Sequence, residues 1–429
     1  MNEFYNRNIL EKIIDDDILD NMALQNVYSA LNETLFPFLN DEEKAFIEEL
    51  EQFCVKLEPT IDLEKDVYVL FPKLGEKGYL QRMNPWKNFT KAGMKYEVLL
   101  GLILAICDAE LDLARLASGI LAGNPCYHHN DGKDAVLKAM DELFAGTKVG
   151  CIGITEPSRG SDAVNMQTIC TKVDDGVRFS GEKVFTTNGA KADYWVAYGV
   201  YNTANPRGSM VQALISRDMG ITTKRLGIWS VPRVHIAHTF FNDCIVPNDY
   251  ILGDDGKGYK NLFEGLTPER ISITGSAMGI CWGNLIRSML YCDQRVQFGK
   301  QISKYQGVSF INGDLFAKLM AGTILALDLA GFYDENILDL ERKGKRPSKT
   351  AEKTASSQAA MAKYYLTKLS HEISYEVQQA MGGISVTDNL KVDRATDVSK
   401  IQEVIGGTRN VMLLLITGAI KRTVRGILK

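Results

Sequence analysis

The chain has 429 residues, a length that corresponds to roughly two to four domains of ordinary size. Hydrophobic residues make up 45% and charged residues 24%, which excludes a disordered, collagen-like or simple coiled-coil protein. Lys and Arg (49) nearly balance Asp and Glu (53). The resulting formal charge of −4 argues against a nucleic-acid-binding surface, which needs a basic excess.

Two apolar runs, residues 98–107 and 411–420, are candidates for membrane spans. Each is about half of the ~20 residues that a span requires, so both predict buried helices. The N-terminus soon reaches three consecutive aspartates and lacks the basic and apolar regions of a signal peptide and the Arg-rich character of a transit peptide. We therefore expect a cytoplasmic protein.

The cysteines and histidines show no metal-binding spacing. Eight cysteines are scattered without a Cys-x-x-Cys, and none of the five histidines belongs to His-Glu-x-x-His. The pair His128 and His129 could ligate a metal, but adjacent residues do not share a helix face, which favours a helix or loop boundary. We expect neither a metal site nor a disulfide framework.

Residues 1–148 have the pattern of a helical domain. Apolar residues recur at helical spacing from Ile9 to Met22, and Asn40 or Asp41 can cap a helix with its buried face along residues 46–57. Residues 99–121 predict another helix, with small residues that allow close packing. Residues 134–144 predict a short helix that ends before Gly146.

Residues 149–260 have the pattern of a β domain. Short β-rich runs at 149–155, 177–180, 184–187, 194–200, 210–215 and 235–241 are separated by turn residues. Asp174, Asp175 and Gly176 predict a hairpin turn. Because no helices separate these runs, we expect an antiparallel sheet or barrel rather than a parallel one.

Residues 261–429 return to a helical pattern. Thr267 followed by Pro268 predicts a helix start that continues to about Gln294. Further helices are expected over residues 310–340 and 349–381, joined by a basic connection at 341–347 that is interpreted as solvated rather than as an anion-binding patch. The chain is thus mainly α with a central β domain.

Several common functional motifs are missing. No Gly-x-Gly-x-x-Gly follows a predicted strand, the glycines at 256 and 258 lack the P-loop spacing, and no Gly-x-Ser-x-Gly is present. A nicotinamide Rossmann site, a P-loop and a serine hydrolase are therefore unsupported.

Five short motifs remain, each weak by itself. The run from Thr155 to Asp162 follows a strand and is rich in small residues, so it can present N–H groups and hydroxyls to an electron-rich ring or a carbonyl. It is followed by Phe185 with two threonines. The other three are Arg-Val-Gln-Phe-Gly from Arg295, Gln-Ala-Met-Gly-Gly from Gln379, and Gly-Gly-Thr from Gly406.

In this order the motifs resemble those of the acyl-CoA dehydrogenase family of flavoproteins. The resemblance extends from about residue 39 to the C-terminus, and residues 1–36 are interpreted as an extension. It implies an N-terminal helical domain, a middle antiparallel β-barrel and a C-terminal four-helix bundle, with FAD bound between barrel and bundle. It also implies a dimer or a homotetramer in which each FAD reaches into a neighbouring subunit.

The resemblance also implies roles for individual residues. Residues on and after the first strand would line the isoalloxazine ring, and residues of the helical region would hold the pyrophosphate and adenosine across the subunit interface or close over the cofactor. Arg suits the phosphate role because its guanidinium is a fixed-charge fork, whereas a surface ion pair is the alternative for Arg295. The expected cofactor-binding residues are Ile152, Ile154, Thr155, Gly160, Ser161, Phe185, Thr187, Arg295, Phe298, Gln306, Gln379, Gly382, Gly383, Thr408 and Asn410.

The expected catalytic base has an unusual position. In much of the family a glutamate precedes the Gly-Thr pair, but Gly406 occupies that place here. A second pattern, which resembles that of isovaleryl- and long-chain-type members, has a glutamate directly before an arginine. Glu269 and Arg270 match this pattern. Two carboxylates in one dry site would repel, so a site that uses Glu269 has reason to lose the other.

We therefore predict that Glu269 abstracts the α-proton and that the Gly406 N–H donates to the thioester carbonyl. Ser161 and Arg270 are expected to contact substrate. Two alternatives stay open for the carboxylates: Glu269 could be a helix-start residue that interacts with the macrodipole, and Glu403 could be the base.

The expected function is FAD-dependent α,β-dehydrogenation of an acyl-CoA or an acyl-carrier-protein thioester. An electron-transferring flavoprotein would reoxidise the cofactor. The alternatives are a flavin oxidase or a non-redox thioester lyase on the same fold, and a non-catalytic acyl-CoA-binding protein. Oxygen consumption, catalysis without flavin bleaching, or a colourless purified protein would distinguish them.

Overall fold

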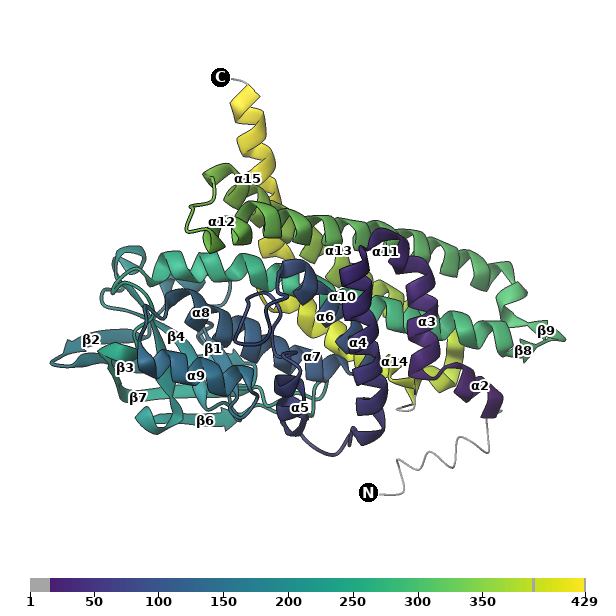
Figure 1. The fold of residues 1–429 in the computed structure, drawn as a ribbon, viewed down its shortest axis with the longest axis horizontal. Coiled ribbons are helices and arrows are strands. Elements are labelled where there is room, and N and C mark those ends of the chain that lie inside the picture. The colour runs from purple at the N-terminus through teal and green to yellow at the C-terminus, as the bar shows by residue number, and fades with distance from the viewer. Residues whose placement is uncertain (1–15, 388–389, 428–429) are drawn as a thin grey trace.

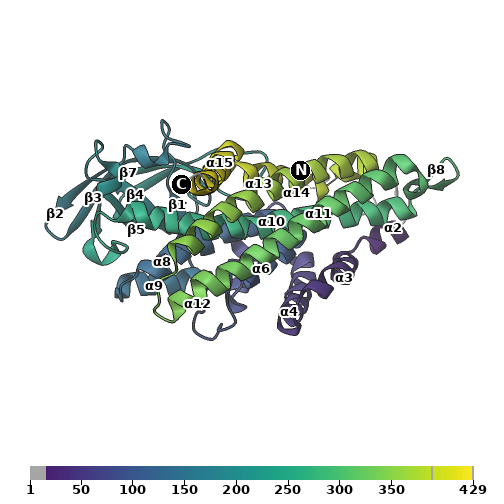
Figure 2. The same ribbon diagram turned by 90° about the horizontal axis from the view of Figure 1, so that it is seen from above.

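The computed structural model describes residues 16–387 and 390–427. Figure 1 shows a sheet at one end of an elongated molecule, with long helices that extend to the other end. Seen from above, these long helices lie roughly along the long axis (Figure 2). Along the chain, helices come first, strands follow, and helices return, which confirms the predicted fold class.

The first helices pack around an apolar core. They are α2 (Asp16–Asn21), α3 (Leu24–Leu35), α4 (Asp41–Leu57), α5 (Phe71–Glu76), α6 (Met94–Cys107), α7 (Ala109–Leu116), α8 (Asn124–His129) and α9 (Asp134–Phe144). Asn40 caps α4 as predicted, because its side chain accepts the Glu43 N–H at 2.9 Å while the Glu43 carboxylate accepts the Asn40 N–H at 3.1 Å. The part of the first predicted helix before residue 16 lies outside the described residues.

The single helix predicted over residues 99–121 is wrong. Asp108 interrupts it with an extended backbone (φ −155°, ψ 101°), and its carboxylate accepts the Leu111 N–H at 3.1 Å. This capping bond gives α7 its own start. A π-helical segment, Ala117–Gly123, follows α7, and Ser118 on it accepts the N–H of Gly150 at 2.9 Å. Such segments are frequent at functional sites.

The strands form one curled sheet. They are β1 (Gly150–Gly153), β2 (Ile169–Val173), β3 (Gly176–Thr186), β4 (Tyr194–Val200), β5 (Met210–Ser216), β6 (Ile221–Arg225) and β7 (Ala237–Pro247). Their order is β1-β4-β2-β3-β7-β6, with β5 paired to β4. The predicted turn at residues 174–176 joins β2 to β3, with Val173 opposite Gly176.

Most pairings in this sheet are antiparallel, as expected, but two are parallel. β1 runs parallel to β4 with Ile152 opposite Val196, and β2 meets β4 in parallel at Ile169 and Val200. A parallel pair needs a long crossover, and here residues 154–193 supply it. The two runs predicted at 177–180 and 184–187 are one strand, β3, with irregularities in register between them.

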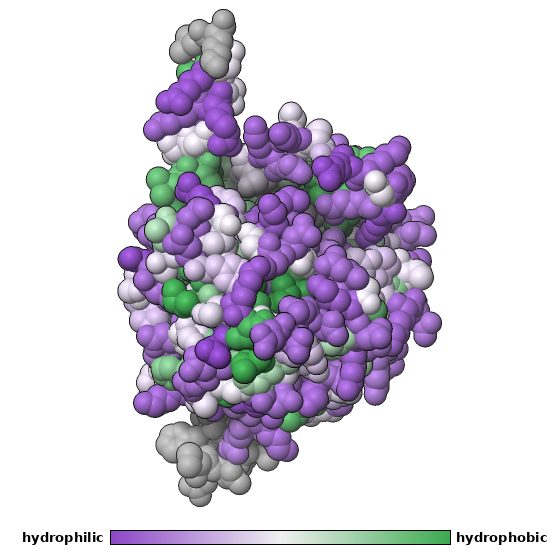
Figure 3. Space-filling model, turned by 90° about the vertical axis from the view of Figure 1, so that its left-hand side faces the viewer, coloured by the Kyte–Doolittle hydropathy of each residue, from purple (hydrophilic) through white to green (hydrophobic). Residues whose placement is uncertain are grey.

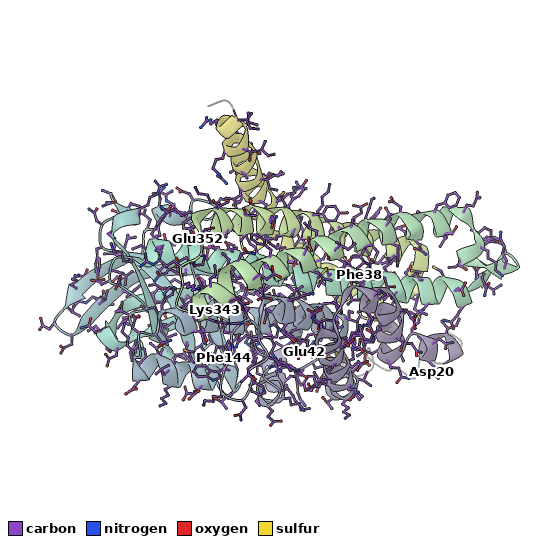
Figure 4. The ribbon with its side chains drawn as sticks, turned by 45° about the horizontal axis from the view of Figure 1, so that its top comes forward. Asp20, Phe38, Glu42, Phe144, Lys343 and Glu352 are labelled. Carbon is purple, nitrogen blue, oxygen red and sulfur yellow. The ribbon has the colours of Figure 1, made fainter. Side chains whose placement is uncertain are left out.

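The second half of the chain folds into long helices and a small hairpin. The helices are α10 (Gly258–Gln294), α11 (Gln306–Tyr333), α12 (Asp339–Arg342), α13 (Lys349–Met381), α14 (Val392–Val404) and α15 (Arg409–Ile427), and the hairpin is β8 (Val296–Gln297) with β9 (Lys300–Gln301). The basic connection lies between α12 and α13, with Lys343 in the turn and Glu352 at the start of α13 (Figure 4).

The helix start predicted at Pro268 is wrong, because α10 begins ten residues earlier and continues through the proline. Pro268 removes one backbone hydrogen bond, but it and the residues that follow are buried among α6, α11 and α13. Tertiary packing therefore overrides the local signal, and Glu269 lies inside the helix rather than at its positive end.

The burial predicted for residues 411–420 is also wrong. Only Met412 of α15 is buried, and Leu414 and Ile420 are 73% and 58% exposed. The reason is that α15 projects from the body, as Figures 1 and 3 show. The other run, residues 98–107, is buried in α6 as expected.

One helix of the described part of the chain, Gln306–Arg342, is long and apolar enough to cross a membrane by length and composition. Its most apolar window is 44% buried, and its α11 part packs against α10 and α13. α14 and α15 would pass the same test only if taken together, across a bend of 47°.

Candidate active site

Glu269 is a buried carboxylate in the interior of α10. Only 3% of the surface of this residue is exposed. Burial raises its pKa above the ordinary value, while the neighbouring cations Arg270 and Lys363 act in the opposite direction. A buried carboxylate with a raised pKa is a stronger base than one in water, which is the property that a proton-abstracting group requires.

Gly406 lies directly against this carboxylate. It follows α14 in a left-handed conformation (φ 62°), and a Cβ at this position would lie 2.9 Å from Glu269 Oε1. Arg270 Nε donates to the Gly406 carbonyl at 3.0 Å. The two positions that could carry the family's glutamate therefore converge on one place in the fold.

Lys363 lies beneath the same turn. It comes from α13 and is 1% exposed, and its Nζ donates to the carbonyls of Ile405 and Gly407 at 2.5 and 2.6 Å. With Arg270 on the carbonyl between them, all three carbonyls of the turn are bound to cations. Within the described residues, the N–H groups of Gly406 and Gly407 have no hydrogen-bond acceptor.

Glu403 is the rival base, and its surroundings are different. It forms ion pairs with Lys400 and, at 3.8 Å, with Arg409. Burial alone would raise its pKa, but these cations more than compensate and hold the pKa below the ordinary value. Two carboxyls near one turn thus have pKa values displaced in opposite directions, an arrangement that separates a base from a structural anion.

The turn predicted to line the flavin is fixed by a buried ion pair. Glu156 accepts the Thr168 N–H at 2.9 Å, the Thr168 hydroxyl at 2.7 Å and the Lys183 ammonium at 2.8 Å. Lys183 comes from β3 and is fully buried. Burial would raise the pKa of Glu156, but Lys183 and the other donors hold it below the ordinary value. Through this one carboxylate the turn is tied to β3 and to the residue that directly precedes β2.

The start of this turn shares a core with α10. Ile152 and Ile154 pack against a cluster that includes Tyr198 of β4 and Leu262 of α10. Ile152 is also opposite Val196 of β4, two residues before Tyr198. The Glu269 carboxylate contributes to a raised pKa of buried Tyr198, behind burial and other groups. The sheet thus places the start of the predicted flavin turn against the first part of α10, about two helical turns before Glu269.

The other predicted residues of this face are accessible to a ligand. Gly160 and Ser161 are exposed, and Thr155 and Thr187 are partly buried. Phe185 is 65% exposed and has a positive φ of 57°, which is rare for an aromatic residue and typical of functional sites. An exposed ring beside hydroxyls and a small-residue turn fits a flat, polar-edged ring such as isoalloxazine.

The residues expected to bind pyrophosphate lie elsewhere. Arg295, Phe298 and Gln306 border the β8–β9 hairpin, at the opposite end of the molecule from the sheet (Figure 1). Phe298 is 96% exposed with a φ of 50°. One chain alone therefore does not bring these residues to the turn at 155–162. The remaining predicted residues lie at the C-terminal end of α13 or directly after it, and at the start of α15 or directly before it; all are exposed or partly buried: Gln379, Gly382, Gly383, Thr408 and Asn410.

Sequence reasoning missed two residues that shape the site, Lys363 and Lys183. Lysines are almost never fully buried without a partner, so neither type nor spacing indicates burial. The apolar neighbours of Lys363, Ala362 and Leu366, could have suggested that it lies on the buried face of its helix.

Comparison with known proteins agrees with this geometry. Acyl-CoA dehydrogenase, middle domain, matches residues 151–244, and acyl-CoA dehydrogenase, C-terminal domain, matches residues 256–421. The chain belongs to the acyl-CoA dehydrogenase family. As an acyl-CoA dehydrogenase it is an FAD-dependent oxidoreductase, which confirms the predicted family, enzyme class and cofactor.

Individual relatives of this acyl-CoA dehydrogenase cover most of the chain. It is 31% identical over 328 residues to the short-chain specific acyl-CoA dehydrogenase of Megasphaera elsdenii, over 74% of this chain and 80% of that one. The structure of butyryl-CoA dehydrogenase from the same organism matches with a TM-score of 0.77 at 27% identity, covering 89% and 98%. The caffeyl-CoA reductase-Etf complex subunit CarC of Acetobacterium woodii is 25% identical over 303 residues, covering 70% and 75%.

Proposed function

We propose that this acyl-CoA dehydrogenase oxidises the α,β-bond of an acyl-CoA thioester with Glu269 as its base. The observation that carries the proposal is the convergence of Glu269 and Gly406: the carboxylate comes from the bundle helix, and the loop position beside it has no side chain. This corresponds to the isovaleryl- and long-chain-type pattern, not to the pattern with a glutamate on the loop.

In the proposed reaction, FAD when bound supplies the acceptor for the hydride from the β-carbon. Groups of the chain itself accept the proton and bind the thioester oxygen. Glu269 accepts the proton from the α-carbon, and its raised pKa favours that transfer. The N–H groups of Gly406 and Gly407, which have no acceptor in the described part of the chain, can donate to the thioester oxygen as negative charge develops on it. The product is the α,β-unsaturated thioester.

The residues that would hold FAD divide into two groups. The ring group is Ile152, Ile154, Thr155, Gly160, Ser161, Phe185 and Thr187, and the phosphate and adenosine group is Arg295, Phe298, Gln306, Gln379, Gly382 and Gly383, with Thr408 and Asn410 near the loop. We propose that Ser161 and Arg270 take part in substrate binding, Ser161 by direct contact. Arg270 would act through its bond to the Gly406 carbonyl, which fixes the donor loop.

An anaerobic titration of the FAD-loaded protein with a panel of acyl-CoAs tests the proposal. We expect a saturated short- or branched-chain acyl-CoA to bleach the flavin absorbance, with formation of one enoyl-CoA per flavin. Bleaching requires electron transfer from substrate, so it separates a dehydrogenase from a lyase or a binding protein. If no thioester bleaches the flavin, including acyl-carrier-protein thioesters, the proposed reaction is wrong.

We further propose that each FAD is shared by two chains. The β8–β9 hairpin is remote from the ring group in one chain, and α15 leaves Leu414 and Ile420 exposed, as a surface covered by a second copy would. A symmetric dimer would bring one chain's hairpin to the other chain's turn. A homotetramer would repeat this dimer.

Arg295→Ala is expected to weaken FAD binding about 10-fold or more, since hydrogen bonds to charged groups contribute about 1.5–3 kcal/mol. Arg295 is exposed, so the substitution should not change folding. Dissociation of FAD followed by its fluorescence measures the affinity. Lys304→Ala removes the same charge from an exposed residue of the same connection and should leave the affinity unchanged. Equal affinity for Arg295→Ala and wild type would contradict the phosphate role.

Mixed oligomers test whether the site is shared. Phe185→Asp places a charge in the ring group, and Arg295→Ala removes the phosphate contact. In a mixed dimer of these two chains, a shared site combines the intact turn of one chain with the intact hairpin of the other, so FAD binding returns at one site. If the hairpin served its own chain, every site would remain defective.

An electron-transferring flavoprotein is the proposed electron acceptor. The relative from Acetobacterium woodii is named as a subunit of an Etf complex, and this chain covers 75% of it. Reoxidation of the bleached enzyme by such a flavoprotein, but only slowly by oxygen, would distinguish the dehydrogenase from an oxidase.

A further inference from the structure

Lys363 is a buried lysine close to both the residue 405–407 turn and the proposed base, Glu269. Its Nζ donates to the carbonyls of Ile405 and Gly407, on either side of Gly406, at 2.5 and 2.6 Å. Glu269 lies against Gly406, the residue between these two carbonyls, and the charges of Glu269 and Lys363 influence each other's pKa. A buried lysine bound only by backbone carbonyls gains little stability for the cost of its burial, which suggests a functional reason for it.

The charged and titratable groups around Glu269 and Lys363 come from several elements. On α10, Arg270 adds a second cation. On α14, Glu403 attracts Lys363 but is itself paired with Lys400 and Arg409. On β4, Tyr198 is buried and neutral at ordinary pH, because burial raises its pKa. Burial lowers the pKa of Lys363 to about 8, so below that pH the buried Glu269 carboxylate is influenced by two cations, Arg270 and Lys363.

The three bound carbonyls have a direct consequence for the turn. A peptide group whose carbonyl is bound to a cation is polarised, so its N–H is a better donor. Lys363 and Arg270 occupy the carbonyls of residues 405–407, whereas the N–H groups of Gly406 and Gly407 have no acceptor among the described residues and remain available as donors. The positive φ values of both glycines, 62° and 103°, allow this conformation.

We propose that Lys363 is a positioning residue that holds the residue 405–407 turn as the donor for the thioester oxygen and keeps the neighbouring Glu269 carboxylate ready to accept a proton. The proposal rests on the proposed role of Glu269. In this proposal one ammonium group both orients the turn and influences the base. Its removal should therefore change the position of the turn and the proton affinity of Glu269 together. Lys363 itself would touch neither substrate nor cofactor.

The proton affinity of Glu269 can be measured without substrate. Infrared difference spectra of the FAD-loaded protein contain a carboxylic-acid band from protonated Glu269, identified by its absence in Glu269→Gln, and the pH at which it disappears gives the midpoint. In Lys363→Met we expect this midpoint to rise by about one pH unit, because an opposite charge nearby has been removed. Lys363→Arg retains the charge and should keep the wild-type midpoint more closely.

Steady-state kinetics supply the second measurement. Loss of the cation that orients a transition-state donor should lower kcat about 10-fold or more, since removing such a donor outright costs 10²–10³. KM should change little, because Lys363 does not contact substrate. Lys368→Met is the matched control: it removes the same charge from an exposed position on the same helix and should leave both the midpoint and kcat unchanged.

The outcomes separate this proposal from the proposed function. An unchanged midpoint in Lys363→Met, or a loss confined to KM, would overturn the role of Lys363 even if acyl-CoAs bleach the flavin. A shifted midpoint in a protein that no thioester bleaches would leave the role intact and reject the reaction. If Lys363→Met does not bind FAD, Lys363→Gln, which retains a donor without the charge, is expected to show the same rise in midpoint, and its absence would be equally decisive.

Discussion

Glu269→Gln is expected to lower turnover at least ~10²-fold while FAD stays bound, the usual scale for loss of a general base. Glutamine retains the shape and burial of the side chain but cannot accept the α-proton. Because Glu269 is 3% exposed and lies against Gly406, no water is expected to replace it efficiently. The measurement is the rate of flavin bleaching in single turnover, which reports the chemical step and not reoxidation.

Glu403→Gln is the matched control for this substitution. It makes the same chemical change on the other carboxylate near the turn, which is already paired with Lys400 and Arg409. Turnover should stay within about threefold of wild type, since a paired carboxylate with a lowered pKa is a poor base. If Glu403→Gln abolished bleaching and Glu269→Gln did not, the two assignments would have to be exchanged.

The pH dependence of the wild-type enzyme gives the same test in another form. The base must be deprotonated, so the rate rises as pH increases through its pKa. Burial raises the pKa of Glu269, and therefore the rising limb should lie at higher pH than for a glutamate in water. In Glu269→Gln the residual rate should lose this limb.

Gly406→Glu is expected to inactivate the enzyme, whereas the same change combined with Glu269→Ala should restore activity. In the single variant the new Cβ would lie 2.9 Å from Glu269 Oε1, on a backbone with φ 62°. The strained conformation alone costs about 1–3 kcal/mol. Two carboxyl groups would then share one buried site, and their repulsion would raise the pKa of one of them, which would stay protonated.

The double variant tests whether the two chain positions reach one point in space. Removing the Glu269 carboxylate vacates the place into which a residue 406 side chain points, so Glu269→Ala/Gly406→Glu should turn over at least about 10-fold faster than Glu269→Ala, a part of the general-base contribution. Glu269→Ala/Gly407→Glu is the control, because a Cβ on Gly407 meets Met412 instead. Equal rates for both double variants would contradict the convergence.

The sequence predicts well where local chemistry and tertiary packing agree. The Asn40 cap, the β4 strand and the helix over residues 349–381 all lie where residue type and periodicity place them. The prediction fails at Pro268, where a strong helix-start signal is overridden by burial of the whole of α10. It also misses β2 and β6, because only one residue of each strand is fully buried and neither shows a regular apolar alternation.

The candidate site was predictable only in part for a related reason. Glu269 and Gly406 could be paired through a resemblance of motifs, because both carry recognisable neighbours in the sequence. Lys363 could not, since its proposed role depends on two carbonyls more than 40 residues away in the sequence. Every residue has a backbone carbonyl, so the sequence does not indicate which carbonyls bind a cation.

The position of the β8–β9 hairpin links cofactor binding to assembly. If the phosphate group of one chain's FAD is held by another chain, then flavin binding and chain association stabilise each other by the same free energy, as thermodynamic linkage requires. A dilute protein would release flavin, and a flavin-depleted protein would dissociate. The yellow colour of a preparation would then depend on its concentration, and the amount of FAD in the cell could regulate how much of the enzyme is assembled.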